Sequence, residues 1–246
     1  MNYNFIFAGS KKTKHSQLLL IIIVVLGLFL MSSCKSTTVL LANFKNDNIG
    51  SPPGSAQPTG TVSLKSGGGS ITVVSAPLAS LPSNKWALIT HTAGPPSNPT
   101  EETTLTGTFS KFFGLGKYGL LCSMHIPSGA GVVTVQFESF NQQASFMHLD
   151  FMPEGDVRVD DNNNIRFGHF PRDVNFVLSV SLNITAAAAT VEISLLGAGA
   201  SGNTTVNVQP LFLNVAKQFG AVKYWIGFQH TAKFFVDDIL VTRSNN

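Results

Sequence analysis

Cysteine is scarce in this sequence, because only Cys34 and Cys122 occur among its 246 residues. Two cysteines can form at most one disulfide, so a disulfide-rich scaffold is excluded. Cys122 lies in the half-apolar run YGLLCSMHI (118–126), where a small buried thiol is the expected state. We therefore interpret Cys122 as an inert core residue rather than as a catalytic nucleophile.

The main part of the sequence also lacks a net charge. The whole excess of 16 Lys and Arg over 13 Asp and Glu equals three lysines near the start, Lys11, Lys12 and Lys14. From Cys34 onward the two signs balance. A nucleic-acid-binding domain carries a basic surface, so nucleic acid is not predicted as a partner.

Motifs for enzymatic chemistry are missing as well. The sequence contains no Gly-x-Ser-x-Gly elbow for a serine nucleophile and no cluster with the ligand spacing of a zinc site. It also lacks a Glu-x-Asp-x-x-Glu run, which would place two glycosidase carboxylates on one strand. Glu138 and Asp150 on neighbouring predicted strands are the remaining pair. Catalysis is therefore not the favoured interpretation, and it stays open.

Residues 1–34 have the order of an export signal. After the three lysines, Leu18–Met31 forms a run of 14 residues without a polar side chain, followed by the small residues Ser32 and Ser33. A membrane-spanning helix needs about 20 apolar residues, whereas the apolar region of a signal peptide has about 7 to 15. The run therefore predicts a signal peptide.

The stretch Leu30–Cys34 resembles the lipobox of bacterial lipoproteins, although Met31 stands where that family prefers Leu. The resemblance implies a signal peptide over residues 1–33 and lipidation of Cys34 as the first mature residue. Because Lys35 rather than Asp follows, it also implies sorting to the outer membrane of the bacterial cell envelope. A simple secretory signal and an uncleaved membrane anchor are the alternatives.

Beyond Cys34, alternation of apolar and polar residues with period two predicts β-strands. The alternating segments are 133–138, 147–151, 157–159, 165–167, 176–183, 191–195 and 223–229. The Gly-, Pro- and Ser-rich stretches 50–60, 66–70 and 93–104 predict turns, as does TAAAAT at 185–190, and a helical turn is expected within 211–220. Short strands joined by tight turns favour an all-β fold, an antiparallel β-sandwich. We expect one domain over 34–246, with a short tether at 34–37.

Three segments carry a further resemblance: ANFKNDNIGSPP (42–53), GHFPRDVNFVLSVSLN (168–183) and KFFVDDILVTR (233–243). They are similar to the opening strand, the bend before a central strand and the closing strand of concanavalin A-like and laminin-G-like jelly rolls. The resemblance implies a jelly-roll sandwich in which the first and last strands pair.

The same resemblance implies a structural calcium ion, with Asn43, Asp47 and Asp238 as ligands. Oxygen ligands of this kind suit calcium. The alternative is that these side chains only bind loop amides. The segment 156–168 also suggests a calcium loop, but Ile165 occupies the position that an EF-hand needs for Gly. A hairpin turn explains its Asp and Asn residues better.

If the apolar residues of the alternating strands face the core, the opposite faces carry a mixed polar set with one aromatic ring. Aromatic rings that stack on sugars, together with side chains that bind hydroxyls, are typical of glycan sites. The predicted ligand-binding residues are Gln136, Glu138, His148, Asp150, Arg158, Arg166, Trp225 and Gln229. An ordinary solvated face is the alternative. Because 19 Phe outnumber 3 Tyr and 2 Trp, most rings are expected in the core rather than on an aromatic platform.

Together these features predict a membrane-tethered surface lipoprotein that binds glycans without catalysis. The alternatives are a glycoside hydrolase or lyase of concanavalin A-like fold, which needs two convergent carboxylates, and a structural envelope or adhesin component, which predicts no groove.

Overall fold

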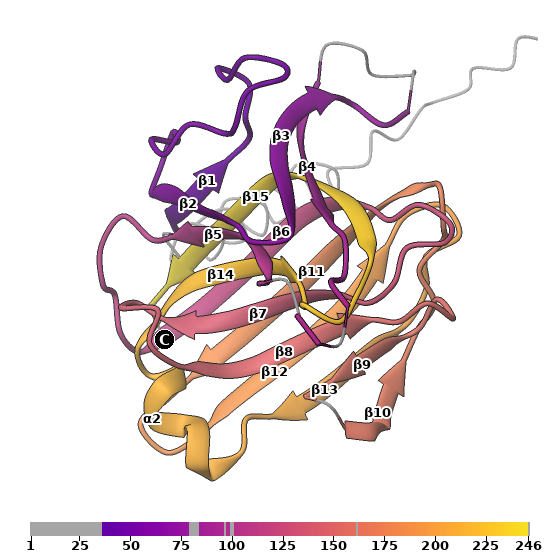
Figure 1. Cartoon of the computed structure of the whole chain (residues 1–246). Helices are drawn as coiled ribbons and strands as arrows, with labels where there is room; N and C mark the ends of the chain where they lie inside the picture. The colour runs from indigo at the N-terminus through magenta and orange to yellow at the C-terminus, as the bar shows by residue number, and fades with distance from the viewer. Residues whose placement is uncertain (1–35, 79–83, 96, 99–100, 161, 246) are drawn as a thin grey trace, which may run out of the picture. The chain divides into compact units, whose positions relative to one another are not determined.

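The computed structural model describes residues 36–78, 84–95, 97–98, 101–160 and 162–245 (Figure 1). Contacts divide the chain into two units, Met1–Lys35 and Ser36–Asn246, and the strands and core described below belong to the second. The predicted signal peptide at 1–33 and the lipidation site Cys34 lie outside the described residues. Among the residues that the structure describes, no helix is long and apolar enough to cross a bilayer.

The unit Ser36–Asn246 is a sandwich of two antiparallel sheets, as the sequence predicts. The eight-stranded sheet has the order β13 (Asn203–Asn207), β12 (Ala189–Leu196), β11 (Asn175–Ile184), β6 (Gly116–His125), β15 (Ala232–Ser244), β4 (Lys85–His91) and β3 (Gly69–Ser75), and β1 (Thr37–Ala42) also pairs with β15. The seven-stranded sheet has the order β10 (Asn162–Phe167), β9 (Val157–Val159), β8 (Ser145–Phe151), β7 (Val133–Ser139), β14 (Phe219–Ile226), β5 (Thr103–Thr108) and β2 (Thr61–Ser66).

The turns and the short helices follow the expectations from sequence. The hairpin predicted in 156–168 forms between β9 and β10, and 185–188 is the turn between β11 and β12, closed by a hydrogen bond from Thr185 N to Ala188 O. The predicted helical turn consists of η1 (Pro210–Phe212) and α2 (Leu213–Ala216). Turns rich in Gly, Pro and polar residues thus separate the strands at the positions that the backbone preferences of these residues predict.

Phenylalanine fills the core between the two sheets. Phe219 at the start of β14 is fully buried, and its ring lies 4.8 to 6.0 Å, centroid to centroid, from those of Phe109, Tyr118, Phe137 and Phe146. These residues come from both sheets and the loop after β5, so one cluster joins the two layers. The expectation that Phe mainly fills the core is confirmed.

Cys122 is a buried free cysteine on β6. Burial raises the pKa of its thiol to about 12, which keeps the sulfur protonated and weakly nucleophilic. The prediction that Cys122 is a buried core residue is confirmed.

The last strand, β15, changes partner half-way along its length. It pairs with β4 up to Val236 and with β1 from Ile239 onward, while β6 lies along its other side. The register with β6 shifts between Asp237 and Leu240, and Asp238 has a positive φ of 48°. Asp237 lies at this bulge opposite Ser123 of β6, and its side chain is fully buried.

We expect Phe219→Ala to reduce the free energy of unfolding by about 3–5 kcal/mol, because it removes the ring shared by both layers and leaves a cavity. Denaturant-induced unfolding followed by circular dichroism measures this change. Leu211→Ala, at a side chain that is 81% exposed, is the control and should stay within about 0.5 kcal/mol of the parent. Equal effects of the two substitutions would contradict the proposed role of the cluster.

Candidate functional site

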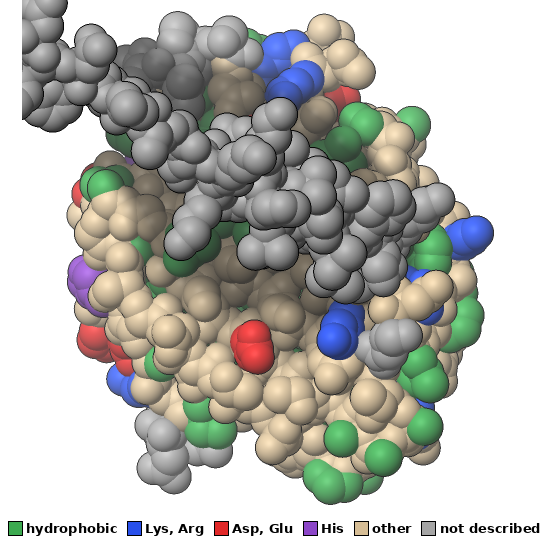
Figure 2. Space-filling view, turned by 180° about the vertical axis from the view of Figure 1, so that it is seen from behind, with side chains coloured by type: hydrophobic (Ala, Val, Ile, Leu, Met, Phe, Trp, Pro, Cys, Tyr) green, Lys and Arg blue, Asp and Glu red, His purple; other side chains and the backbone are tan. Residues whose placement is uncertain are grey.

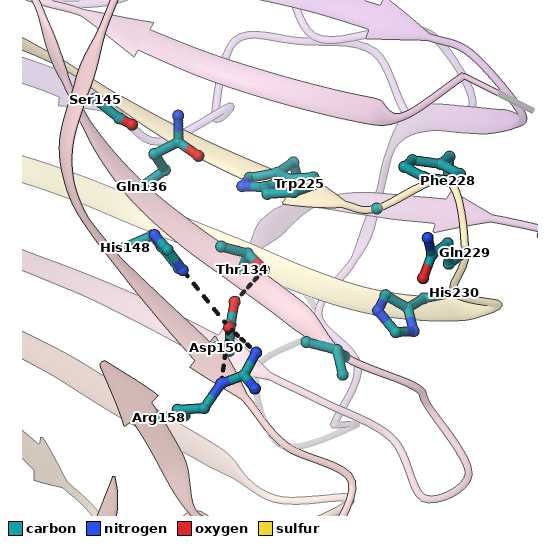
Figure 3. Close-up of a pocket in the computed structure, with 12 residues that line it drawn as sticks. Thr134, Gln136, Ser145, His148, Asp150, Arg158, Trp225, Phe228, Gln229 and His230 are labelled. Carbon is teal, nitrogen blue, oxygen red and sulfur yellow. Dashed lines mark hydrogen bonds and ion pairs between the residues drawn. The ribbon is translucent and has the colours of Figure 1, made fainter. Parts of the chain in front are cut away.

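A pocket of about 410 Å³ opens on the outer face of the seven-stranded sheet (Figure 3). It contains six of the eight residues predicted from sequence: Gln136, His148, Asp150, Arg158, Trp225 and Gln229. Its other lining residues are Val132, Thr134, Ser145, Gly227, Phe228 and His230. Their role in binding stays a prediction, but the structure brings them together.

Strand register explains why these residues meet. Asp150 on β8 lies opposite Thr134 on β7 and opposite Arg158 on β9, and Trp225 on β14 also lies opposite Thr134. His148 lies opposite Gln136. Because side chains of paired residues point to the same face of a sheet, one set of registers aligns these positions on four adjacent strands.

Asp150 is the centre of the polar network in the pocket. Its Oδ1 accepts a hydrogen bond from Thr134 Oγ1 at 2.7 Å, and its Oδ2 accepts one from Arg158 Nη2 at 2.7 Å. The Nε2 atom of His148 lies 3.8 Å from the same Oδ2. The carboxylate is almost fully buried, and its pairing with a guanidinium offsets the cost of burying its charge. Asp150 therefore fixes the positions of its neighbours.

A turn residue also orients His148. Asp160 has a positive φ of 52°, and its Oδ1 accepts a hydrogen bond from the His148 backbone N at 2.8 Å. The same oxygen lies 3.7 Å from His148 Nδ1. His148 is thus placed between two carboxylates, of which only Asp150 lines the pocket.

The opposite wall is formed by Trp225 and the turn after β14 (Figure 3). Alternation along 223–229 predicted Phe228 in the core, and that prediction is wrong, because Phe228 is 45% exposed. β14 ends at Ile226, and a turn closed by the hydrogen bond from His230 N to Gly227 O follows. Burial lowers the pKa of His230, although Asp150 opposes this shift.

Two predicted residues, Glu138 and Arg166, do not line this pocket. The register between β7 and β8 shifts after Phe137, and Glu138 is buried beside Gln136, whose Nε2 donates to its Oε1 at 2.9 Å. Burial raises the pKa of Glu138. Arg166 on β10 pairs instead with Asp156, at 3.4 Å between Nη1 and Oδ2.

The two carboxylates that the sequence places on neighbouring strands do not share the pocket. Glu138 lies four positions along β7 from Thr134, the residue opposite Asp150, a backbone separation of about 13 Å at the rise of a strand. Asp150 is, moreover, the sole acidic residue among the twelve that line the pocket.

The residues predicted as calcium ligands do not share one cavity. Asn43 and Asp47 line a depression near the first turn, whereas Asp238 lines an apolar hollow with Leu41 and Leu121. The Asp47 Oδ1 atom accepts a hydrogen bond from Gly54 N at 2.9 Å. Within the described ranges, no group of three His, Cys, Asp or Glu side chains could hold a metal ion. Asn and carbonyl oxygens would have to complete any calcium site there.

Asp237 is a further oxygen donor that sequence reasoning left unassigned. Neither of its carboxylate oxygens has a hydrogen-bond partner of ordinary geometry. Burial raises its pKa to about 7, while Asp238 N–H, Lys45 and the Asn84 amide act in the lowering direction. Such an orphaned buried carboxylate is costly by itself, so it fits a bound cation in chemical terms.

The sequence matches no protein-family model. No curated protein matches it either.

Several solved structures share the fold. An endo-1,3-β-glucanase from Streptomyces sioyaensis has 13% identity and a TM-score of 0.53, with 86% of this chain and 97% of that chain covered. Lectin II from Ulex europaeus has 10% identity and a TM-score of 0.50, with 85% and 100% covered. A sialidase has 10% identity and a TM-score of 0.50, with 83% of this chain covered. This chain spans only 18% of that sialidase.

These identities are too low to show a shared activity. They show the architecture, which confirms the prediction from sequence: the protein has the concanavalin A-like β-sandwich fold of lectins and glucanases.

Proposed function

We propose that the protein is a non-catalytic binding module for glycans and that the pocket around Asp150 and Trp225 is its binding site. The observation that carries this proposal is the combination, in one pocket, of aromatic rings with amide, imidazole, hydroxyl and guanidinium groups. The volume of about 410 Å³ lies within the usual range for small-ligand sites. Proteins that share the fold include a lectin and a glucanase.

The pocket chemistry supports binding rather than hydrolysis. A rigid network around Asp150 presents hydrogen-bond donors at set positions, and a preorganised network loses little entropy when a ligand binds. The Trp225 ring offers an apolar surface beside it, with Lys223 Nζ 5.1 Å from the ring centroid. Glycosidases use two carboxyl groups, one as the acid and one as the nucleophile or base. This pocket contains one carboxylate, Asp150, and Arg158 binds it. The pocket itself also argues against a purely structural envelope component.

Trp225→Ala should weaken glycan binding by about 30-fold or more, since a central aromatic contact is worth about 2 kcal/mol or more. The measurement is a glycan array with the fragment 36–246, followed by calorimetry on the best ligand. No binding across plant, host and microbial glycans would contradict the proposal, and release of reducing sugar would favour the hydrolase alternative.

Two arginines provide a matched pair for testing the site. Arg158→Gln removes the partner of a buried carboxylate and should reduce affinity about tenfold or more. Arg166→Gln lies on the next strand but outside the pocket, and it should leave affinity within about twofold. Equal losses would place the binding surface elsewhere on the sheet.

We further propose that the protein is held in the bacterial cell envelope, at the outer membrane, by a lipid on Cys34. The support is the signal-like order of residues 1–33 and the lipobox resemblance. Cys34→Ala should abolish incorporation of labelled fatty acid and release the protein from membrane fractions. Unchanged membrane association without label would favour the uncleaved anchor.

Calcium remains a proposal, with Asn43, Asp47 and Asp238 as ligands and Asp237 as an added carboxylate. At 100 times its Kd, calcium should stabilise the fold by about 2.7 kcal/mol, which raises Tm by roughly 5–10 °C for a domain of this size. Thermal unfolding with calcium and with EDTA measures the shift. Asp237→Asn should abolish it, and the exposed Glu154→Gln is the control. Equal Tm values with calcium and EDTA would contradict the proposal.

A further inference from the structure

Three of the seven large hydrophobic side chains that are exposed among the described residues lie at one end of the sandwich. Phe112 is 52% exposed, Leu115 41% and Leu211 81%. We call this region the tether end, and it consists of the segments 36–37, 109–117, 139–144, 185–188, 208–218 and 243–245.

Strand pairing and loop contacts show that these segments adjoin. Thr37 lies opposite Arg243, Lys117 opposite Ser244, and Gly116 opposite Ile184 at the 185–188 turn. Backbone hydrogen bonds join Phe109 N to Gly220 O and Phe140 N to Gln218 O. The rings of Phe112 and Phe140 lie 6.2 Å apart. In Figure 1, α2 and the C-terminus lie on the same side of the sandwich.

The tether end is basic. Its segments contain Lys111, Lys117, Lys217 and Arg243, and no Asp or Glu. Figure 2, seen from behind, shows hydrophobic and basic side chains along the right-hand side, whereas acidic side chains lie at the centre, the top and the left. A protein that is neutral as a whole therefore presents a positive, partly apolar surface at this end.

Several contacts hold the exposed loop 110–115 in place. The Arg243 guanidinium lies 5.8 Å from the Phe113 ring centroid, and its Nη2 donates to Leu115 O. The Tyr118 hydroxyl donates to Gly114 O. The backbone of the loop is thus anchored at two successive carbonyls, while the side chains of Phe112 and Leu115 point away from the core and stay exposed. Because the loop is already fixed, the apolar side chains of Phe112 and Leu115 would lose little conformational entropy on binding a partner surface.

The chain enters the sandwich at the same end. Thr37 begins β1 beside Arg243, and Cys34 precedes Thr37 by three residues, a reach of about 10 Å. A lipid on Cys34 would keep this end within that reach of a bilayer surface. Because the segment between Cys34 and Thr37 is so short, we take a membrane as the partner that contacts this surface.

We propose that the tether end is a membrane-contact surface. Phe112, Leu115 and Leu211 enter the headgroup region of the bilayer, and the basic residues bind the phosphates of anionic phospholipids. The inference rests on the proposed lipidation of Cys34 for its choice of partner, but the contact can be tested without the lipid.

This orientation leaves the pocket accessible. β14 runs from Phe219, next to the tether end, to Ile226 beside the pocket, a length of about 23 Å at the rise of a strand. With the tether end on the membrane, the turn at 227–230 would point away from it. A ligand could then reach the Trp225 wall while the protein stays attached.

The test uses the fragment 36–246, which contains the whole core and both sheets and carries no lipid. Vesicles of phosphatidylcholine alone and with 30 mol% phosphatidylglycerol are the probes, and co-sedimentation measures partitioning. We expect binding to the anionic vesicles only. Lys111→Gln with Lys117→Gln should weaken it about fivefold for each charge removed, and Phe112→Ser with Leu115→Ser about tenfold or more.

Matched controls lie at the opposite end of the sandwich. Lys233→Gln, at the start of β15, and Leu196→Ser, at the end of β12 and 49% exposed, should leave vesicle binding within about twofold. Thermal unfolding checks that every variant folds. Absence of vesicle binding by the parent, or equal losses in tether-end and control variants, would overturn the inference. A dimer that dissociates in the tether-end variants would assign this surface to self-association instead. None of these outcomes depends on glycan binding or on lipidation.

Discussion

The rest of the structure depends on the pairing of β15 with three strands. This last strand contacts β4 in its first half, β1 in its second half and β6 along its other side. It therefore joins the beginning and the end of the domain, which are otherwise far apart in sequence. The change of partner coincides with a bulge, at which the Asp237 carboxyl group is fully buried and makes no hydrogen bond of ordinary geometry. The change of strand partner is thus accompanied by a buried carboxyl group. That buried group is the physical reason to consider a cation there.

The pocket is a product of register in the other sheet. Four strands contribute side chains at matched positions, and Asp150 holds two of them through short hydrogen bonds to Thr134 and Arg158. A shift of one residue in any of these strands would send the corresponding side chain into the core. The site is therefore as stable as the sandwich itself, and its geometry is set before a ligand arrives. Such rigidity suits the proposed recognition role.

The two ends of the sandwich differ in chemistry. One end carries the chain entry at Thr37, a basic surface and exposed Phe112 and Leu115, while the Trp225 wall of the pocket and the turn at 227–230 lie towards the other end. Antiparallel strands impose this separation, because alternate turns must lie at opposite ends of the sheets. The proposed lipid attachment and the proposed binding site would therefore be separated along the strands without a long linker. The proposed membrane contact and the proposed recognition site thus lie at different sets of turns.

The sequence by itself determined the fold class, most strands, the hairpin at 156–168 and the outward direction of Trp225, because period-two alternation and turn residues are local properties. It also predicted six residues of the pocket, since alternation assigns a face to each strand position. Only the tertiary structure decided which strands are neighbours, and this excluded Glu138 and Arg166 and added Phe228 and His230. The end of β14 at Ile226 brought Phe228 and His230 to the pocket, whereas Glu138 and Arg166 keep the predicted face but lie outside the pocket, farther along β7 and on β10. Pairing between distant strands, which no local pattern specifies, is what gathers single residues into a site.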